Sequence, residues 1–167
     1  MDENIVTEII TKSYYLTTAT CVNNRPWIAP TIFWIDNELN FYIVSHIGSR
    51  HVQDIQINSK VAISIYDSTQ PEGTGKGVQF GGYGTVIAND ELKSAIEWLW
   101  KQRLSMSELE LTAFILDRIK VWSDNNRVVV KIRVDDEGMF LNKWDGKDYR
   151  VPVKISADIK LVEFNRK

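Results

Sequence analysis

The sequence predicts a mainly β domain with peripheral helices, most simply a small antiparallel barrel, built as a single domain over residues 1–167. Two observations predict this fold class. Most of the chain consists of short runs of β-branched and aromatic residues, separated by clusters of turn residues. Helical periodicity is confined to one short segment near the middle and one longer region at 89–122. No repeat, linker or break in composition divides the chain.

The first strands lie in the N-terminal quarter. Residues 13–22 are rich in aromatic and β-branched side chains, which favour strands. Two further strand-like runs, 27–35 and 38–45, flank the pair Asp36-Asn37, a compact hairpin signal. Pro30 has no N–H to donate, so its strand is expected to be an edge strand, or to be bulged or bent there.

Two strands are predicted after the short helix. Residues 60–67 alternate, with Val61, Ile63 and Ile65 expected on one face. A loop at 68–76 leads to a second strand at 77–87. This second strand contains several glycines, which indicate a bulge or the close approach of a backbone or a ligand.

The helical region contains two predicted helices, and more strands follow it. Residues 89–103 begin with acidic residues, end with basic ones and carry one apolar stripe. In the helix over 106–122, Ser107 and Glu110 have the spacing of a capping box. The remaining strands are predicted at 127–134, 139–144 and 158–164, with a turn at 135–138.

Composition excludes several classes of function. The chain is 44% hydrophobic and 25% charged with a net charge of −2, so no basic field draws it to nucleic acid or to an anionic membrane. The start lacks the features of a signal peptide, and no run is long enough to span a membrane. Cys21 is the single cysteine and is expected to be a buried, unreactive thiol. We therefore expect a soluble cytoplasmic protein.

The short helix over 50–57 contains an electrostatic conflict. Ser49 is a good N-cap, and Arg50 and His51 then occupy the first turn, where the helix dipole disfavours cations. A bound anion would resolve the conflict, because free backbone N–H groups, a hydroxyl, a guanidinium and an imidazole would converge on it. The alternative is a capped surface helix with a solvated arginine, and spacing alone does not decide between them.

Other catalytic chemistry is not evident from the sequence. His46 and His51 are the only histidines, and nothing pairs either one with a nucleophile. Their spacing, without neighbouring cysteine or acidic ligands, makes a poor metal site, so no metal is expected. If the protein is an enzyme, a bound cofactor is expected to carry the reaction.

An ordered set of motifs resembles the pyridoxamine 5'-phosphate oxidase-like family of FMN-binding split barrels. The resemblance covers residues 13–88, and 145–153 resembles the C-terminal strand region of some members. The motifs that carry it are APTIFW (29–34), FYIVS (41–45), SRH (49–51), INSKVAISIYD (57–67) and GVQFGGYGTVI (77–87).

The resemblance implies an antiparallel split β-barrel with a short phosphate-binding helix, a two-helix insertion at 89–122, and a homodimer holding FMN between its subunits. The backbone at Pro30, Thr31 and Ile32 would run beside the isoalloxazine ring. The FMN phosphate would be held by Ser49, Arg50 and His51. Gln79 would reach the flavin from the adjoining wall.

Departures from the oxidases indicate a diverged member. The true oxidases commonly carry a lysine where His51 stands and an arginine where Ala29 stands, and their C-terminal arginine–histidine substrate pair is not visible here. We therefore expect an FMN-dependent oxidoreductase with a small-molecule substrate that is not pyridoxamine phosphate.

Three alternatives stay open: a flavin- or haem-binding protein without turnover, a deazaflavin-dependent reductase, and a dimeric barrel that serves only for interaction. Six Trp and six Tyr exceed what a small monomeric core needs, which favours a subunit interface.

Overall fold

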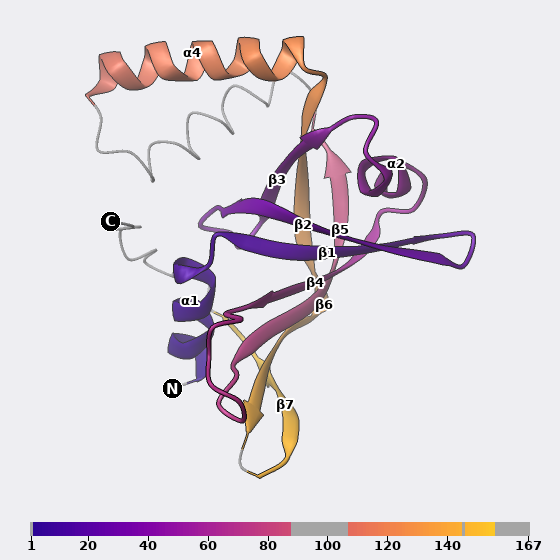
Figure 1. Cartoon of the computed structure of the whole chain (residues 1–167), viewed down its shortest axis with the longest axis vertical. Helices are drawn as coiled ribbons and strands as arrows, with labels where there is room; N and C mark the ends of the chain where they lie inside the picture. The colour runs from indigo at the N-terminus through magenta and orange to yellow at the C-terminus, as the bar shows by residue number, and fades with distance from the viewer. Residues whose placement is uncertain (1, 88–106, 145, 156–167) are drawn as a thin grey trace.

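Seven strands form one antiparallel sheet that curls into a ring in the computed structural model, which describes residues 2–87, 107–144 and 146–155 (Figure 1). The strands are β1 (Tyr15–Val22), β2 (Arg25–Ile35), β3 (Phe41–His46), β4 (Lys60–Tyr66), β5 (Gly77–Val86), β6 (Arg127–Trp144) and β7 (Asp148–Val153). The described helices are α1 (Asp2–Lys12), α2 (Arg50–Ile57) and α4 (Glu108–Asp124).

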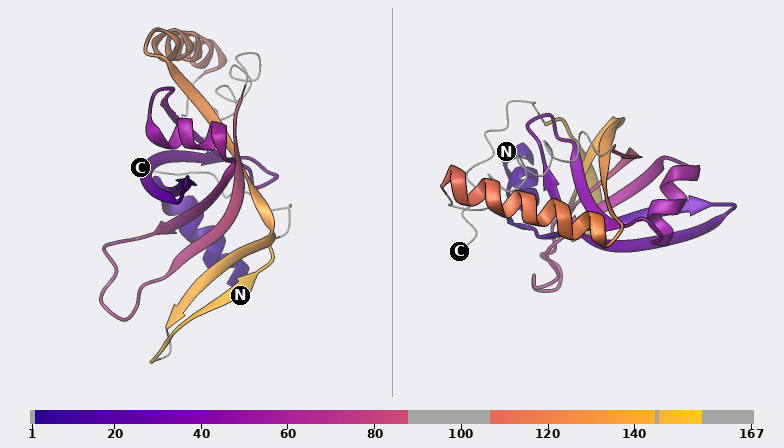
Figure 2. Two further views of the ribbon diagram at one scale, coloured as in Figure 1. Left: turned by 90° about the vertical axis from the view of Figure 1, so that its right-hand side faces the viewer. Right: turned by 90° about the horizontal axis from the view of Figure 1, so that it is seen from above.

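The ring closes through β6. The strand order across the sheet is β3-β2-β1-β4-β5-β6-β7. An additional pairing of β3 with β6 closes the sheet into a ring. Phe41 to His46 of β3 pair with Arg127 to Ile132, the first part of β6. The second part of β6 pairs instead with β7, which extends away from the ring as a hairpin (Figure 2). This arrangement confirms the split barrel.

The turn predicted at 135–138 is wrong. Residues 127–144 form one strand, and the acidic residues Asp135, Asp136 and Glu137 lie in a bulge within it. Val134 pairs with Gly82 and Met139 pairs with Phe80, so the four residues between them oppose Gly81 alone. The Asp135 carboxylate lies where a side chain at Gly81 would be. A glycine on the facing strand therefore makes room for the bulge, which a turn signal read from one strand cannot show.

Several local predictions are confirmed. In β2, residues 25–32 pair with β1 and, within the described chain, with no other strand, so Pro30 lies on an edge. Val61, Ile63 and Ile65 are buried as the alternation predicted. The capping box forms, with Ser107 Oγ donating to Glu110 at 2.6 Å and Glu110 N donating to Ser107 Oγ at 3.4 Å.

The helices differ from the prediction in one respect. Helix α2 has the predicted bounds, and α4 matches the second helix of the insertion. Helix α1 was not predicted, although Asp2 and Glu3 lie in its first turn and Lys12 in its last. The predicted helix 89–103 and strand 158–164 lie outside the described residues.

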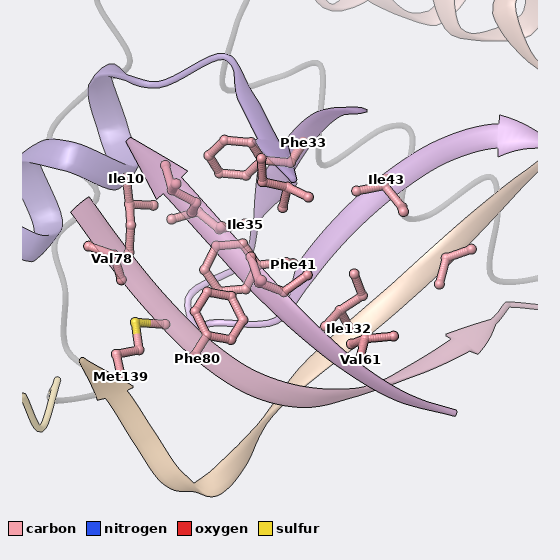
Figure 3. Close-up of a cluster of buried hydrophobic side chains, with 14 of the residues drawn as sticks. Ile10, Phe33, Ile35, Phe41, Ile43, Val61, Val78, Phe80, Ile132 and Met139 are labelled. Atoms are coloured by element: carbon pink, nitrogen blue, oxygen red, sulfur yellow. The ribbon is translucent and has the colours of Figure 1, made fainter. Parts of the chain in front are cut away.

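The main core fills the ring. Phe33, Phe41 and Phe80 meet there, with ring centroids 5.8 Å apart for the first pair and 4.7 Å apart for Phe41 and Phe80 (Figure 3). Helix α1 contributes Val6 and Ile10, and helix α2 contributes Val52 and Ile55. The two helices thus owe their positions to burial of these apolar side chains.

Close packing at the bulge gives a testable consequence. A Cβ at Gly82 would lie 2.6 Å from the carbonyl oxygen of Arg133, a backbone atom that cannot move without breaking the β5–β6 pairing. Gly82→Ala is expected to destabilise the protein by about 1–3 kcal/mol in urea unfolding, as overpacking usually does. Gly75→Ala is the control, because nothing lies within 4 Å of its added methyl group. Equal stability of the two variants would contradict this packing.

Candidate functional site

Helix α2 follows β3 after a connection of three residues and lies against β1, β2 and β5. Ser49 is its N-cap residue by position, but its side chain does not cap the helix. Instead, Ser49 Oγ donates to the carbonyl oxygen of His46 at 2.7 Å. The backbone N–H groups of the first turn therefore donate no hydrogen bond to the N-cap side chain. They remain the positive end of the helix dipole.

Arg50 is held on three sides. Its guanidinium carbon lies 4.7 Å from the centroid of the Trp27 ring, a cation–π contact. Its Nη2 donates to the carbonyl oxygen of Arg25 at 3.3 Å, and its Nε lies 3.7 Å from Oδ2 of Asp54. The Arg50 side chain is nevertheless 36% exposed. The guanidinium is thus positioned at the surface with one edge open to solvent.

His51 points into the protein. Its side chain is 7% exposed, and its Nε2 and the Oγ of Ser45 share a hydrogen bond of 2.7 Å. Burial lowers the pKa of the imidazole, and the nearby Asp54 carboxylate opposes this only in part. His51 is therefore a neutral hydrogen-bonding group at pH 7, and Arg50 carries the positive charge at the start of α2.

The face of β2 that carries Trp27 is directed towards the inside of the ring, and we call it the inner face. From Trp27, beside Arg50, it extends along the strand to Thr31. Trp27, Ala29 and Thr31 share this face, because they pair with the buried Thr20, Thr18 and Leu16 of β1. The hydroxyl oxygens of Thr18 and Thr31 are buried and have no hydrogen-bond partner among the described residues. Unpaired buried hydroxyls are costly, so each points to a missing partner.

The outer face of the sheet carries the other predicted residues. Pro30 pairs with Thr17, Thr17 with Ser64, and Ser64 with Gln79, so all four side chains lie in one row on the outside. Gln79 Oε1 accepts a hydrogen bond of 2.9 Å from Arg150 Nε of β7. Within one chain, the sheet therefore separates Gln79 from Arg50.

A cavity of about 650 Å³ lies beside Pro30 on the outer side. It is bordered by α1, the start of β1, and the loop between β4 and β5, with Tyr14, Tyr66 and Lys76 in its wall. Ile32 is exposed on the same face of β2 as Pro30. Cys21 lies near the other end of β1, away from this cavity, opposite Pro26. It is exposed, so the prediction of a buried thiol is wrong.

The structure thus places the predicted residues in two groups. Ser49 and Arg50 lie at the start of α2, which packs on the inner side of β2 where Thr31 lies. Pro30, Ile32 and Gln79 lie on the outside. Sequence reasoning missed Trp27, Thr20 and Asp54. Only Asp54 had a signal, because it follows Arg50 by four residues on a helix, the spacing of an ion pair.

Two other kinds of feature are absent from the described residues. No group of three or more His, Cys, Asp or Glu side chains there could hold a metal ion. None of the helices in the described ranges has the length and apolar character to cross a membrane.

Comparisons with known proteins relate the chain to one family. A family model described as pyridoxamine 5'-phosphate oxidase matches residues 1–136. The UPF0306 protein PM1958 of Pasteurella multocida (strain Pm70) is 25% identical over 118 residues, which cover 70% of this chain and 74% of that protein.

Solved structures share the fold. Atu2129 of Agrobacterium tumefaciens aligns with a TM-score of 0.66 and 15% identity, over 84% of this chain and 56% of that one, so the chain spans about half of its length. HutZ, described as the heme storage protein of Vibrio cholerae, gives a TM-score of 0.59 and 19% identity over 83% and 92%. An FAD-binding protein of Mesorhizobium loti gives 0.59 and 13% over 83% and 91%.

The buried imidazole predicts a pH dependence of stability. The pKa of His51 is lower in the folded protein than its ordinary value of 6.5, so the unfolded chain binds the proton more readily. The His51 contribution to the free energy of unfolding is complete above pH 6.5 and is lost as the pH falls through the lowered pKa. His51→Gln is expected to flatten the slope of stability against pH below the ordinary value of 6.5 in urea unfolding. A His46→Gln variant separates the contribution of the other histidine. An unchanged slope in His51→Gln would contradict this assignment.

Proposed function

The chain belongs to the pyridoxamine 5'-phosphate oxidase family, and on this basis we propose that it binds FMN and transfers electrons or a hydride between the flavin and a small-molecule substrate. The observation that carries the proposal is the position of Arg50. Its guanidinium stacks on Trp27 at the start of α2 and keeps an open edge at the surface. An arginine at the positive end of a helix dipole is a suitable ligand for a phosphate monoester.

The residues on the inner face of β2 fit a flavin. The unpaired buried hydroxyl of Thr31 lies on the strand expected beside the isoalloxazine ring, and it needs a hydrogen-bond partner. Flavin ring nitrogens and carbonyl oxygens can supply one. When bound, FMN would supply the two-electron redox chemistry, and the protein would bind it, orient it and exclude water.

At the phosphate, we propose unequal roles for Ser49 and for the first two residues of α2, Arg50 and His51. Arg50 supplies the charge, and the uncapped N–H groups of the first turn add hydrogen bonds. Ser49 can contribute its hydroxyl oxygen only by turning away from His46. His51 contributes as a neutral group held by Ser45. One formal charge against a dianionic phosphate implies weaker binding than in the oxidases that carry a lysine at the position of His51.

We propose that the functional unit is a homodimer with a flavin shared between the subunits. The outer edge of β2 exposes backbone groups that pair with no described strand, and large apolar side chains lie along it, with Ile28 64% and Ile32 42% exposed. Exposed edge strands with apolar side chains favour association. Gln79 cannot reach a ligand on Arg50 of its own chain, so in this proposal it reaches the flavin held by the other subunit.

The phosphate contact predicts a selective loss of FMN binding. Arg50→Ala is expected to weaken FMN binding about 10- to 100-fold, because a charge-assisted hydrogen bond contributes roughly 1.5–3 kcal/mol. Riboflavin, which lacks the phosphate, should bind both proteins equally. Flavin fluorescence titration measures both ligands. The matched control is Arg118→Ala, since Arg118 also stacks on an aromatic ring, that of Phe114 on α4.

Other ligands are included in the same titration. A wild-type protein that binds neither FMN nor riboflavin would refute the proposal, and binding of haem or a deazaflavin instead would establish one of the alternatives. If FMN binds, reduction by a nicotinamide and reoxidation by a panel of acceptors tests turnover. Bound FMN that no donor reduces would identify a carrier rather than an enzyme.

The shared site predicts complementation between subunits. Mixed dimers of Arg50→Ala and Gln79→Ala protomers contain one doubly altered site and one unaltered site if Gln79 acts across the interface. Such dimers should hold FMN at half of their sites with wild-type affinity. If Gln79 acts within its own chain, every site carries one change and no tight site appears. Light scattering on the same samples measures whether they are dimers, and a monomer would contradict the shared site.

A further inference from the structure

Asp54 is a buried carboxylate that contacts both a strand of the sheet and the arginine at the start of its own helix. It lies on α2, one turn after Arg50, and is only 8% exposed. Burying a carboxylate is costly unless it is paired and hydrogen-bonded. Its partners among the described residues are Thr20 and Arg50, with the neutral His51 beside it.

A strand residue fixes the Asp54 carboxylate. Thr20 on β1, itself 3% exposed, donates its Oγ1 hydrogen to Oδ2 of Asp54 at 2.8 Å. The same Oδ2 lies 3.7 Å from Nε of Arg50. The carboxylate is therefore tied to the sheet on one side and faces the arginine on the other. Because β1 pairs with both β2 and β4, this contact relates the guanidinium to the sheet and not only to its own helix.

The orientation of Arg50 follows from where these contacts fall. The Asp54 carboxylate is paired with Nε, and the Arg25 carbonyl accepts a hydrogen bond from Nη2. The Trp27 ring covers one face of the guanidinium. Among the described residues, no hydrogen bond or ion pair takes Nη1. The contacts thus leave Nη1 of the guanidinium to meet an anion, while Asp54 stays at the Nε side.

We propose that Asp54 is a positioning residue, which acts through Arg50 to hold the guanidinium ready for an anionic ligand. An unattached arginine loses much side-chain freedom when it binds an anion, and an arginine ordered beforehand loses less. Asp54 also opposes an anion by its charge, but it contacts Nε and leaves Nη1 open. This inference rests on the proposed function, because the anion in view is the FMN phosphate.

The binding test uses Asp54→Asn, which keeps the shape of the side chain and an acceptor for Thr20. FMN affinity is expected to fall about tenfold, while riboflavin affinity stays unchanged. In an Arg50→Ala background, the same substitution should have no further effect, because a positioning residue acts only through the residue it positions. Thr20→Val, which frees the carboxylate without removing its charge, should give a smaller loss in the same direction.

A second readout needs no flavin. The side-chain Nε–H signal of Arg50 in a nitrogen-15 NMR spectrum, assigned by its loss in Arg50→Lys, should be sharp in the wild-type protein and exchange-broadened in Asp54→Asn. This result supports the positioning role even if FMN does not bind, in which case only the proposed function fails.

Three outcomes would overturn the inference. Tighter FMN binding by Asp54→Asn would show that Asp54 mainly repels the phosphate. An equal loss in the Arg50→Ala background would show a purely structural role. An unchanged Arg50 signal would show that Trp27 and Arg25 suffice. Circular dichroism establishes that each variant is folded.

Discussion

The pairing of β3 with β6 is the constraint on which the rest of the structure depends. Without it the sheet would be open, and the inner faces of β2 and β3 would not enclose a core. One strand makes this closure and also supports β7, because the bulge opposite Gly81 lets β6 pair with β3 in its first part and with β7 in its second. The cost is a tight fit of the β5 glycines against β6.

Closure also determines where α2 lies. The helix follows β3 after three residues and packs on the inner side of β1, β2 and β5, where Gly84 leaves room for Ile55. Its first turn is thereby placed beside Trp27 on the edge strand. The barrel end, the helix dipole and the edge of β2 meet at Arg50. Because the backbone brings these three features together, Arg50 is the one charged side chain that the proposed anion site needs at the start of α2.

Much of this could be predicted from the sequence, for identifiable reasons. Alternation in 60–67, the bounds of α2 and the Ser107 capping box depend on local periodicity and local hydrogen bonds, and all three are confirmed. The acidic run in β6 is a bulge because Gly81 faces it, a relation between distant residues. The direction of His51 and the contacts of Asp54 likewise depend on β1 and β3, and no local pattern contains them.

The central claim is that the edge of β2 and the start of α2 form one flavin site, with the phosphate at Arg50. In this proposal, the two faces of one sheet would contact the flavins of different subunits. Thr31 and Arg50 lie on the inner side, and Gln79 lies on the outer face. A crystal structure of the protein grown with FMN tests this most directly. The account predicts the phosphate within hydrogen-bonding distance of the Arg50 guanidinium of one subunit and the flavin ring beside Gln79 of the other. A phosphate bound elsewhere, with Arg50 still directed at solvent, would contradict it.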